Sequence, residues 1–251
     1  MARAVDVLKA FAKADEWSVS ALARELGQHK SVTYRLVATL AAGGLLVKDA
    51  DTERYALSML VSTLARRAER RTSLGRVARP FLTEVADASQ ETVSLCVLNG
   101  NTGFCLDSLD SPQSMRFTVH VGETFFLHTG AVGKILLAFQ PREFVDNALS
   151  VSPLPRYTES TITDPAVLRR ELDEIRRTGV AFSDGEITPG ARSIGMPVWN
   201  HEGRVIASIA ISGPSFRLEP PDVPRLRKLL TTSAERLSHA LGYRGNYPWN
   251  A

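Results

Sequence analysis

The stretch that decides the fold of the N-terminal part is Gly27-Gln-His-Lys-Ser-Val-Thr-Tyr-Arg-Leu-Val-Ala-Thr-Leu-Ala-Ala-Gly-Gly-Leu-Leu-Val-Lys-Asp-Ala-Asp-Thr-Glu-Arg-Tyr-Ala-Leu57. Apolar or small residues at positions 33, 36, 37 and 40 follow helical spacing, whereas Lys30, Tyr34 and Arg35 fall elsewhere on the same helical wheel. We therefore expect a helix with one side on a core and the other offering hydrogen-bond donors and positive charge.

The residues that follow predict a β-hairpin. Gly43-Gly44 ends the helix, and two short strands, 45–48 and 54–57, flank a polar turn. Upstream, Ser18 and Ser20 are alternative caps for a preceding helix, and Gly27 supplies the turn between the two helices. Two helices, a tight turn and a hairpin wing make a winged helix-turn-helix over residues 1–57. Such a unit places its second helix in a DNA major groove.

Composition is consistent with two folded domains. The chain has 251 residues, 44% of them hydrophobic, and a formal net charge of +3. Residues 1–74 hold 12 Lys and Arg side chains against 8 Asp and Glu, so the remaining residues sum to −1. The positive excess therefore lies with the predicted DNA-binding part. Its densest cluster, Arg66, Arg67, Arg70 and Arg71, fits the solvated face of a helix as well as a DNA contact.

Few features indicate a metal, a cofactor or a membrane. Cys96 and Cys105 match no zinc-ligand spacing, and the five histidines are scattered along the chain. The sequence has no signal peptide, no apolar run of about twenty residues and no lipidation motif. We expect a cytoplasmic protein with no metal, no cofactor and no membrane partner, whose two thiols are buried structural ones.

The second half of the chain reads as an α+β domain behind a helical linker. Residues 58–73 continue helically, and the stripe of Leu60, Leu64 and Ala68 suits packing on a partner chain. Residues 74–251 then predict a mixed domain. Its expected elements are a helix at 74–89, a hairpin at 92–109, an extended run Met115–Val121, a helix after Gly130, a helix opened by Asp164-Pro165, strands at 180–183, 192–198 and 205–212, and a last helix at 223–241.

Small residues open the helix after Gly130, in the run Gly130-Ala-Val-Gly133. Two interpretations are open. Small side chains leave backbone N–H groups at a helix N-terminus reachable by an anion. They also allow simple close packing.

The order of these segments resembles the isocitrate-lyase-regulator (IclR-type) family of bacterial transcription regulators, over essentially the whole chain. In the first domain the resemblance rests on Lys30-Ser-Val-Thr-Tyr-Arg-Leu36, Thr39-Leu40 and Arg54-Tyr-Ala-Leu57. In the second it rests on Leu127-His128, Gly133-Lys134, Leu137-Ala138, Gly179-Val-Ala-Phe-Ser-Asp-Gly-Glu186, Gly190-Ala-Arg-Ser193, Pro197-Val198, Gly203-Arg-Val205 and Ser212-Gly-Pro214.

The resemblance implies a GAF-like effector-binding domain whose pocket holds a small organic acid or an aromatic metabolite. Carried over by position, eight residues line that pocket: Phe117, Ala131, Val132, Ser183, Ala191, Ser193, Ala210 and Ser212. Members that bind small carboxylates tend to carry an acidic residue and a cysteine where this chain has Ser183 and Ser193. A smaller residue is also common at the position of Val132. These departures favour a larger or less polar ligand.

The function implied is a DNA-binding transcription regulator controlled by that ligand. We expect DNA contacts from eight residues of the helix and wing: Lys30, Ser31, Val32, Tyr34, Arg35, Lys48, Thr52 and Arg54. The family usually reads Lys-Ser-Thr-Val-Tyr-Arg where this chain has Val32-Thr33, which predicts an apolar base contact from Val32 and a core position for Thr33. One winged helix reads only a short half-site, so at least a homodimer is expected, and the resemblance suggests a dimer of dimers.

Two other classes of protein compete with a regulator. Ser193, His128 and Asp184 have the side chains of a serine hydrolase, but no Gly-x-Ser-x-Gly elbow surrounds any serine, so no enzyme and no catalytic residue is expected. The other alternative is a metabolite sensor that acts through protein partners.

Overall fold

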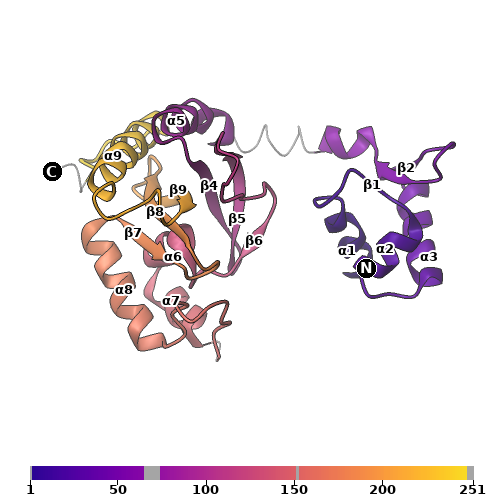
Figure 1. The fold of residues 1–251 in the computed structure, drawn as a ribbon, viewed down its shortest axis with the longest axis horizontal. Coiled ribbons are helices and arrows are strands. Elements are labelled where there is room, and N and C mark those ends of the chain that lie inside the picture. The colour runs from indigo at the N-terminus through magenta and orange to yellow at the C-terminus, as the bar shows by residue number, and fades with distance from the viewer. Residues whose placement is uncertain (1, 65–73, 151–152, 248–251) are drawn as a thin grey trace. The chain divides into compact units, whose positions relative to one another are not determined.

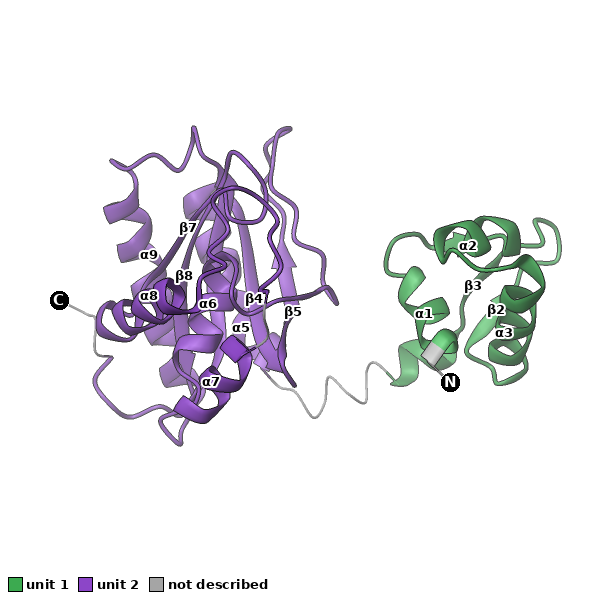
Figure 2. Ribbon diagram, turned by 90° about the horizontal axis from the view of Figure 1, so that it is seen from below, with its two compact units in different colours: residues 1–73 green, residues 74–251 purple. Residues whose placement is uncertain are grey.

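The computed structural model describes residues 2–64, 74–150 and 153–247. The chain divides into two compact units, residues 1–73 and 74–251, drawn in different colours in Figure 2. Of the predicted linker, residues 59–64 are helical and part of the first unit. The rest of the linker, including the four clustered arginines, lies outside the described residues.

The first unit is a helical core with a small sheet. Besides the helical residues 59–64, its helices are α1 (Ala2–Ala10), α2 (Val19–Glu25) and α3 (Lys30–Ala42), and its strands are β1 (Glu16–Trp17), β2 (Leu46–Lys48) and β3 (Tyr55–Leu57). The three antiparallel strands lie in the order β1-β3-β2. The helix-turn-helix and its wing are thus as predicted, and the two-residue strand β1 is an addition that the sequence pattern missed.

The periodicity of α3 explains how it packs. Its buried side chains are Thr33, Val37 and Leu40, one face of the helix, and they join Val7 and Leu22 in the core of the first unit. The predicted core position of Thr33 is confirmed. Burial of this stripe fixes which face of α3 is left to solvent.

The second unit is built on one antiparallel sheet of six strands in the order β6-β5-β4-β9-β8-β7. The strands are β4 (Thr92–Asn99), β5 (Thr102–Leu109), β6 (Thr124–Phe125), β7 (Ala181–Asp184), β8 (Ala191–Trp199) and β9 (Val205–Pro214). The long strands β4, β9 and β8 are central, so residues that lie far apart in sequence become direct neighbours.

Helices cover both faces of this sheet, as Figure 1 shows. Helices α5 (Leu74–Ser89) and α9 (Val223–Ala240) pack on one face, against Leu95, Ile194 and Ile209 among others. Helices α6 (Gly130–Ala138), α7 (Arg142–Ser150) and α8 (Pro165–Thr178) share the core of the opposite face. The predicted α+β class is confirmed. Consecutive residues of β4 divide between the two cores, with Val93 and Leu95 in one and Cys96 in the other.

The ends of α8 agree with the sequence signals. The Asp164 carboxylate accepts from the backbone N–H groups of Ala166 and Val167, at 2.7 and 3.2 Å, and Gly179 follows the helix with φ of +70°. Asp as cap, Pro as first helical residue and Gly in the left-handed region are the expected combination.

The run Met115–Val121, predicted only as extended, is not a strand of the sheet. Met115–Val121 pairs with no strand of the sheet, and the ladder resumes only at β6. This segment is held instead by side-chain contacts, in which the Thr92 hydroxyl donates to the Phe117 carbonyl at 2.5 Å. Helix α7 had no predicted counterpart.

Candidate DNA-binding groove and ligand cavity

A groove of about 1060 Å³ runs between the start of α3 and the wing. It is lined by Ser18, Val19, Ser20, Lys30, Ser31, Tyr34, Arg35, Lys48, Thr52, Glu53 and Tyr55. Six of the eight residues expected at DNA are therefore brought together. Val32 is half-buried and Arg54 is exposed, and neither lines the groove. A base contact from Val32 stays a prediction.

Local structure leaves this groove open to solvent. The Ser18 hydroxyl accepts from the backbone N–H of Ala21 and caps α2, which sets the start of the helix-turn-helix. Gly27 has φ of +60° and lets the chain turn sharply between α2 and α3. Tyr34, on the side of α3 opposite the core, is 56% exposed.

The wing carries both charge signs. Lys48 forms an ion pair with Glu53 at 2.5 Å, and this hydrogen bond raises the pKa of Lys48 and lowers that of Glu53. The Asp49 carboxylate accepts from the backbone N–H and hydroxyl of Thr52, which shapes the turn and lowers the pKa of Asp49. Glu53 thus places a carboxylate in an otherwise cationic groove.

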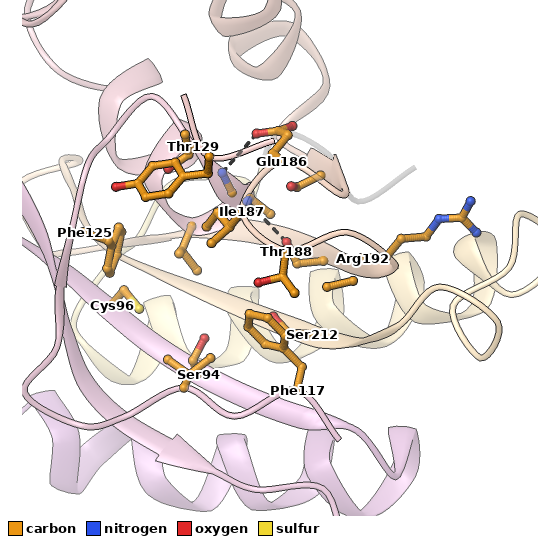
Figure 3. Close-up of a pocket in the computed structure, with 18 of the residues that line it drawn as sticks. Ser94, Cys96, Phe117, Phe125, Thr129, Glu186, Ile187, Thr188, Arg192 and Ser212 are labelled. Atoms are coloured by element: carbon orange, nitrogen blue, oxygen red, sulfur yellow. Dashed lines mark hydrogen bonds between the residues drawn. The ribbon is translucent and has the colours of Figure 1, made fainter. Parts of the chain in front are cut away.

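The second unit contains a cavity of about 190 Å³ on the α6 side of the sheet (Figure 3). It is lined by Ser94, Cys96, Phe117, Val119, Glu123, Thr124, Phe125, Thr129, Gly130, Ala131, Val132, Tyr157, Ser183, Glu186, Ile187, Thr188, Ala191, Arg192, Ser193 and Ser212. Seven of the eight residues carried over from the family resemblance are in its wall. Ala210 is not, because it is fully buried between Ser94 and Gly195 in the sheet.

Strand register places three serines in a row across the cavity floor. Ser183 on β7 is paired with Ser193 on β8, which is paired with Ser212 on β9. Directly paired residues of antiparallel strands point to the same face, with side chains about 4.5–5.5 Å apart. We call Ser183, Ser193 and Ser212 the serine row.

The start of α6 forms the next part of the wall. The backbone N–H of Gly130 donates to Glu186 at 3.0 Å, and that of Ala131 donates to the Ser193 hydroxyl at 3.3 Å (dashed in Figure 3). Gly133 lies so close to Phe126 that a Cβ there would meet its carbonyl oxygen at 3.0 Å. The small residues therefore serve close packing, and the first N–H group is bound by the protein's own carboxylate.

A buried lysine balances that carboxylate. The Lys134 side chain is fully buried, and its ammonium is 2.5 Å from Glu186, 2.5 Å from Glu171 and 2.8 Å from the Phe182 carbonyl oxygen. All of its hydrogen-bonding capacity is used by these three acceptors. The ammonium is thus bound within the protein rather than presented to the cavity.

Arg192 lines the cavity, but its guanidinium is directed away from the other side chains of the wall. The Arg192 guanidinium pairs with Asp184 at 2.9 Å, donates to the carbonyl groups of Ser215 and Leu218, and extends away from the other side chains in Figure 3. The hydrogen bond to Asp184 raises the pKa of Arg192.

The geometry of His128, Asp184 and Ser193 does not support the serine hydrolase alternative. The His128 ring bonds the Pro155 carbonyl oxygen at 2.8 Å, Asp184 pairs with Arg192, and Ser193 accepts from Ala131. Each of the three side chains has its own partner, so these three are not connected as nucleophile, base and acid. Burial lowers the pKa of His128.

Several wall residues were not among those that the sequence assigned to the pocket. Glu186 and Tyr157 belong to loops, and Ser94 and Cys96 come from β4, which only the sheet order brings beside β9. Cys96 faces Cys105 across β4 and β5 as a free thiol, and the hydrogen bond between the two thiols raises the pKa of Cys96. The alternation of residues along β4 could be seen in the sequence, but the pairing of β4 with β9 could not.

Metal-ligand clusters and membrane-spanning helices are absent from the residues that the structure describes. Among them, no three His, Cys, Asp or Glu side chains gather as metal ligands would. Within the same described ranges, no helix has the length and apolar character that crossing a membrane requires.

A winged helix with an outward groove, joined to an α+β domain with a cavity of small-molecule size, defines the class of DNA-binding transcriptional regulators with a sensor domain. Family comparisons agree. Residues 67–239 match the C-terminal domain of the bacterial transcriptional regulator IclR, and residues 1–50 match the IclR helix-turn-helix domain. The chain belongs to the IclR family of DNA-binding transcriptional regulators.

Relatives cover nearly the whole chain. It is 30% identical over 242 residues to the HTH-type transcriptional regulator BhcR of Paracoccus denitrificans, spanning 96% of this chain and 87% of that one. It is 29% identical over 243 residues to the regulator KdgR of Escherichia coli, spanning 97% and 92%. Among solved structures, an IclR homologue from Microbacterium hydrocarbonoxydans in complex with 4-hydroxybenzoate aligns with a TM-score of 0.82, at 29% identity over 96% and 98% of the two chains.

Proposed function

We propose that this protein binds operator DNA through the groove between α3 and the wing, and that a small molecule in the cavity of the second unit sets its DNA affinity. The observation that carries the DNA-binding part is the gathering of Lys30, Arg35 and Lys48 with Ser31, Tyr34 and Thr52 along one groove. Cations and hydroxyl groups in such a groove suit phosphate contacts, while the exposed start of α3 suits base edges.

The wing contributes to selectivity as well as to affinity. Because Glu53 pairs with Lys48, part of the positive charge of the groove is cancelled until DNA is present. A DNA phosphate must displace the Glu53 carboxylate from Lys48. It therefore gains less binding free energy than it would from an unpaired lysine. This arrangement weakens sequence-independent binding, which is mostly electrostatic.

The cavity supports ligand control. It is enclosed by Phe117, Phe125 and Val132 together with a row of hydroxyl groups, a mixture typical of small-molecule sites. The homologue from Microbacterium hydrocarbonoxydans was solved with 4-hydroxybenzoate. We infer a small organic acid or aromatic metabolite as effector, and a coupling of about 1–3 kcal/mol would change DNA affinity about 5- to 150-fold.

The protein acts as a homodimer in this proposal, with a dimer of dimers as the further assembly. Met59, Leu60 and Leu64 on the 59–64 helix are 72%, 43% and 51% exposed, an apolar surface that a second copy would cover. Two winged helices would read two half-sites of a roughly palindromic operator. We also propose that the protein is cytoplasmic, has no catalytic activity and uses no cofactor.

Selection of binding sites from random DNA tests the DNA-binding part. We expect the wild-type protein to enrich an inverted repeat, and Tyr34→Ala to lose the enrichment at defined positions of each half-site. Enrichment of a single half-site would contradict the dimer. Failure to enrich any sequence would favour the alternative of a sensor that acts through protein partners.

A further inference from the structure

We propose that the cavity takes an uncharged, ring-sized ligand that hydrogen-bonds along the serine row, and that it discriminates against the corresponding carboxylate. This inference rests on the proposed function, because it narrows the class of effector at the same site. It concerns ligand charge, which the family resemblance leaves open.

The size of the cavity limits the ligand to about one ring. An apolar cavity of about 150 Å³ holds one benzene molecule, and the cavity here has about 190 Å³. One ring with one or two small substituents fits that volume. Phe117, Phe125 and Val132 supply apolar contacts for such a ring, and Figure 3 shows Ile187 in the midst of the labelled side chains.

The serine row supplies hydrogen bonds that the protein does not use itself. Ser183 and Ser212 are only 5% and 6% exposed, and both lie in the cavity wall. Among the residues that the structure describes, neither hydroxyl has a hydrogen-bond partner, whereas the Ser193 hydroxyl accepts from Ala131. Buried hydroxyl groups are normally bonded. A ligand with polar groups along one edge would satisfy both serines.

Charge in the wall disfavours an anion. A helix N-terminus favours anions, but at the start of α6 the N–H group of Gly130 already binds Glu186. Lys134 is shared between Glu171 and Glu186, which leaves this cluster with one net negative charge. The Arg192 guanidinium pairs with Asp184 and extends away from the other side chains in Figure 3, so a ligand carboxylate would meet hydroxyl groups beside a like charge. An amide or a hydroxyl group meets no such opposition.

Matched pairs of probes test the charge preference. Calorimetric titration of the full chain at millimolar concentrations would compare 4-hydroxybenzamide with 4-hydroxybenzoate, and nicotinamide with nicotinate. We expect the amide of at least one pair to bind, and to bind at least about tenfold more tightly than its carboxylate, a difference of about 1.4 kcal/mol.

Serine variants show whether the row is the binding surface. Ser183→Ala and Ser212→Ala should each weaken the amide at least about threefold, a modest loss for a hydrogen bond. Ser208→Ala is the matched control, because Ser208 is a fully buried serine of the same strand β9 that does not line the cavity. Thermal melting of each variant would check that the fold is retained.

Three results would overturn the inference. They are tighter binding of both carboxylates, failure of both amides to bind at millimolar concentration, and unchanged amide affinity in the two serine variants. A carboxylate that binds more tightly and alters DNA affinity would leave the proposed function standing while this inference fails. Loss of sequence-selective DNA binding would instead remove the proposed function.

Discussion

At the scale of single residues, the DNA-binding groove and the ligand cavity differ in how their positively charged side chains are paired. Arg35 and Lys30 face the groove, where a ligand with many negative charges would lie. Beside the cavity, the buried ammonium of Lys134 is paired with both Glu171 and Glu186. The two sites therefore suit a polyanion and a ligand without net charge.

Replacement of Arg35 by alanine should weaken binding to all DNA sequences alike. A lost phosphate contact releases one counterion fewer, so the slope of log K against log salt should become shallower by about one unit. Fluorescence anisotropy at several salt concentrations would measure both quantities. Arg24→Ala, with the same change in charge at an exposed site that does not line the groove, is the control. An equal effect of the two variants would contradict the assigned role of Arg35.

His128 gives a prediction for pH. Burial holds its pKa below the ordinary value of about 6.5. The folded state therefore binds protons less readily than the unfolded state, and this contribution to stability is present above about pH 6.5 and lost as pH falls below it toward the folded pKa. His128→Gln should reduce the fall in melting temperature over that range. His120→Gln, at an exposed histidine, should follow the wild type, and an indistinguishable pH profile for His128→Gln would show that the histidine does not contribute.

At the scale of elements, strong local signals decided most of the fold. The stripe of α3, the glycines after it and the Asp164-Pro165 pair each act within a few residues, and α3, the wing and α8 formed as predicted. Strand β1 has only two residues, too few for a period. Met115–Val121 alternates like a strand but pairs with no strand of the sheet.

The cavity was harder to predict from the sequence than the fold. The family resemblance pointed to the serine row, and the order β9-β8-β7 shows why these serines are adjacent. The contact of Glu186 with the start of α6 could not be predicted from sequence patterns. Its partners Gly130 and Lys134 lie 56 and 52 positions away along the chain. Residue patterns report local structure, whereas such contacts depend on how whole elements pack.

The cap of α8 provides a test at this scale. Asp164→Ala should lower the free energy of unfolding by about 1 kcal/mol, because two backbone N–H groups lose their acceptor. Asp222 is the matched control: it also precedes a helix that has Pro in its first turn, but its side chain makes no capping hydrogen bond. Urea unfolding of Asp164→Ala, Asp164→Asn and Asp222→Ala would compare them. Equal losses for the two alanine variants would contradict the role of the cap.

At the scale of the whole molecule, the proposal requires two copies. Leu64→Asp would place a charge in the apolar surface of Met59, Leu60 and Leu64, and burial of an unpaired charge at an interface is costly. We expect sedimentation at micromolar concentration to show a dimer or tetramer for the wild type and a smaller species for Leu64→Asp. Ser62→Asp, at an exposed position of the same helix, should assemble like the wild type. A monomeric wild-type protein would refute this part of the proposal.

The central claim is that one molecule both recognises DNA and responds to a ligand. The most direct measurement is fluorescence anisotropy of DNA from the region upstream of the protein's own gene, titrated at low salt with and without the amide and carboxylate probes. We predict sequence-selective, salt-sensitive binding whose affinity changes at least about fivefold with one probe, and a Ser183→Ala variant that needs at least about threefold more of that probe for the same change. Absence of selective binding at low salt, to this or any other genomic fragment, would contradict the account.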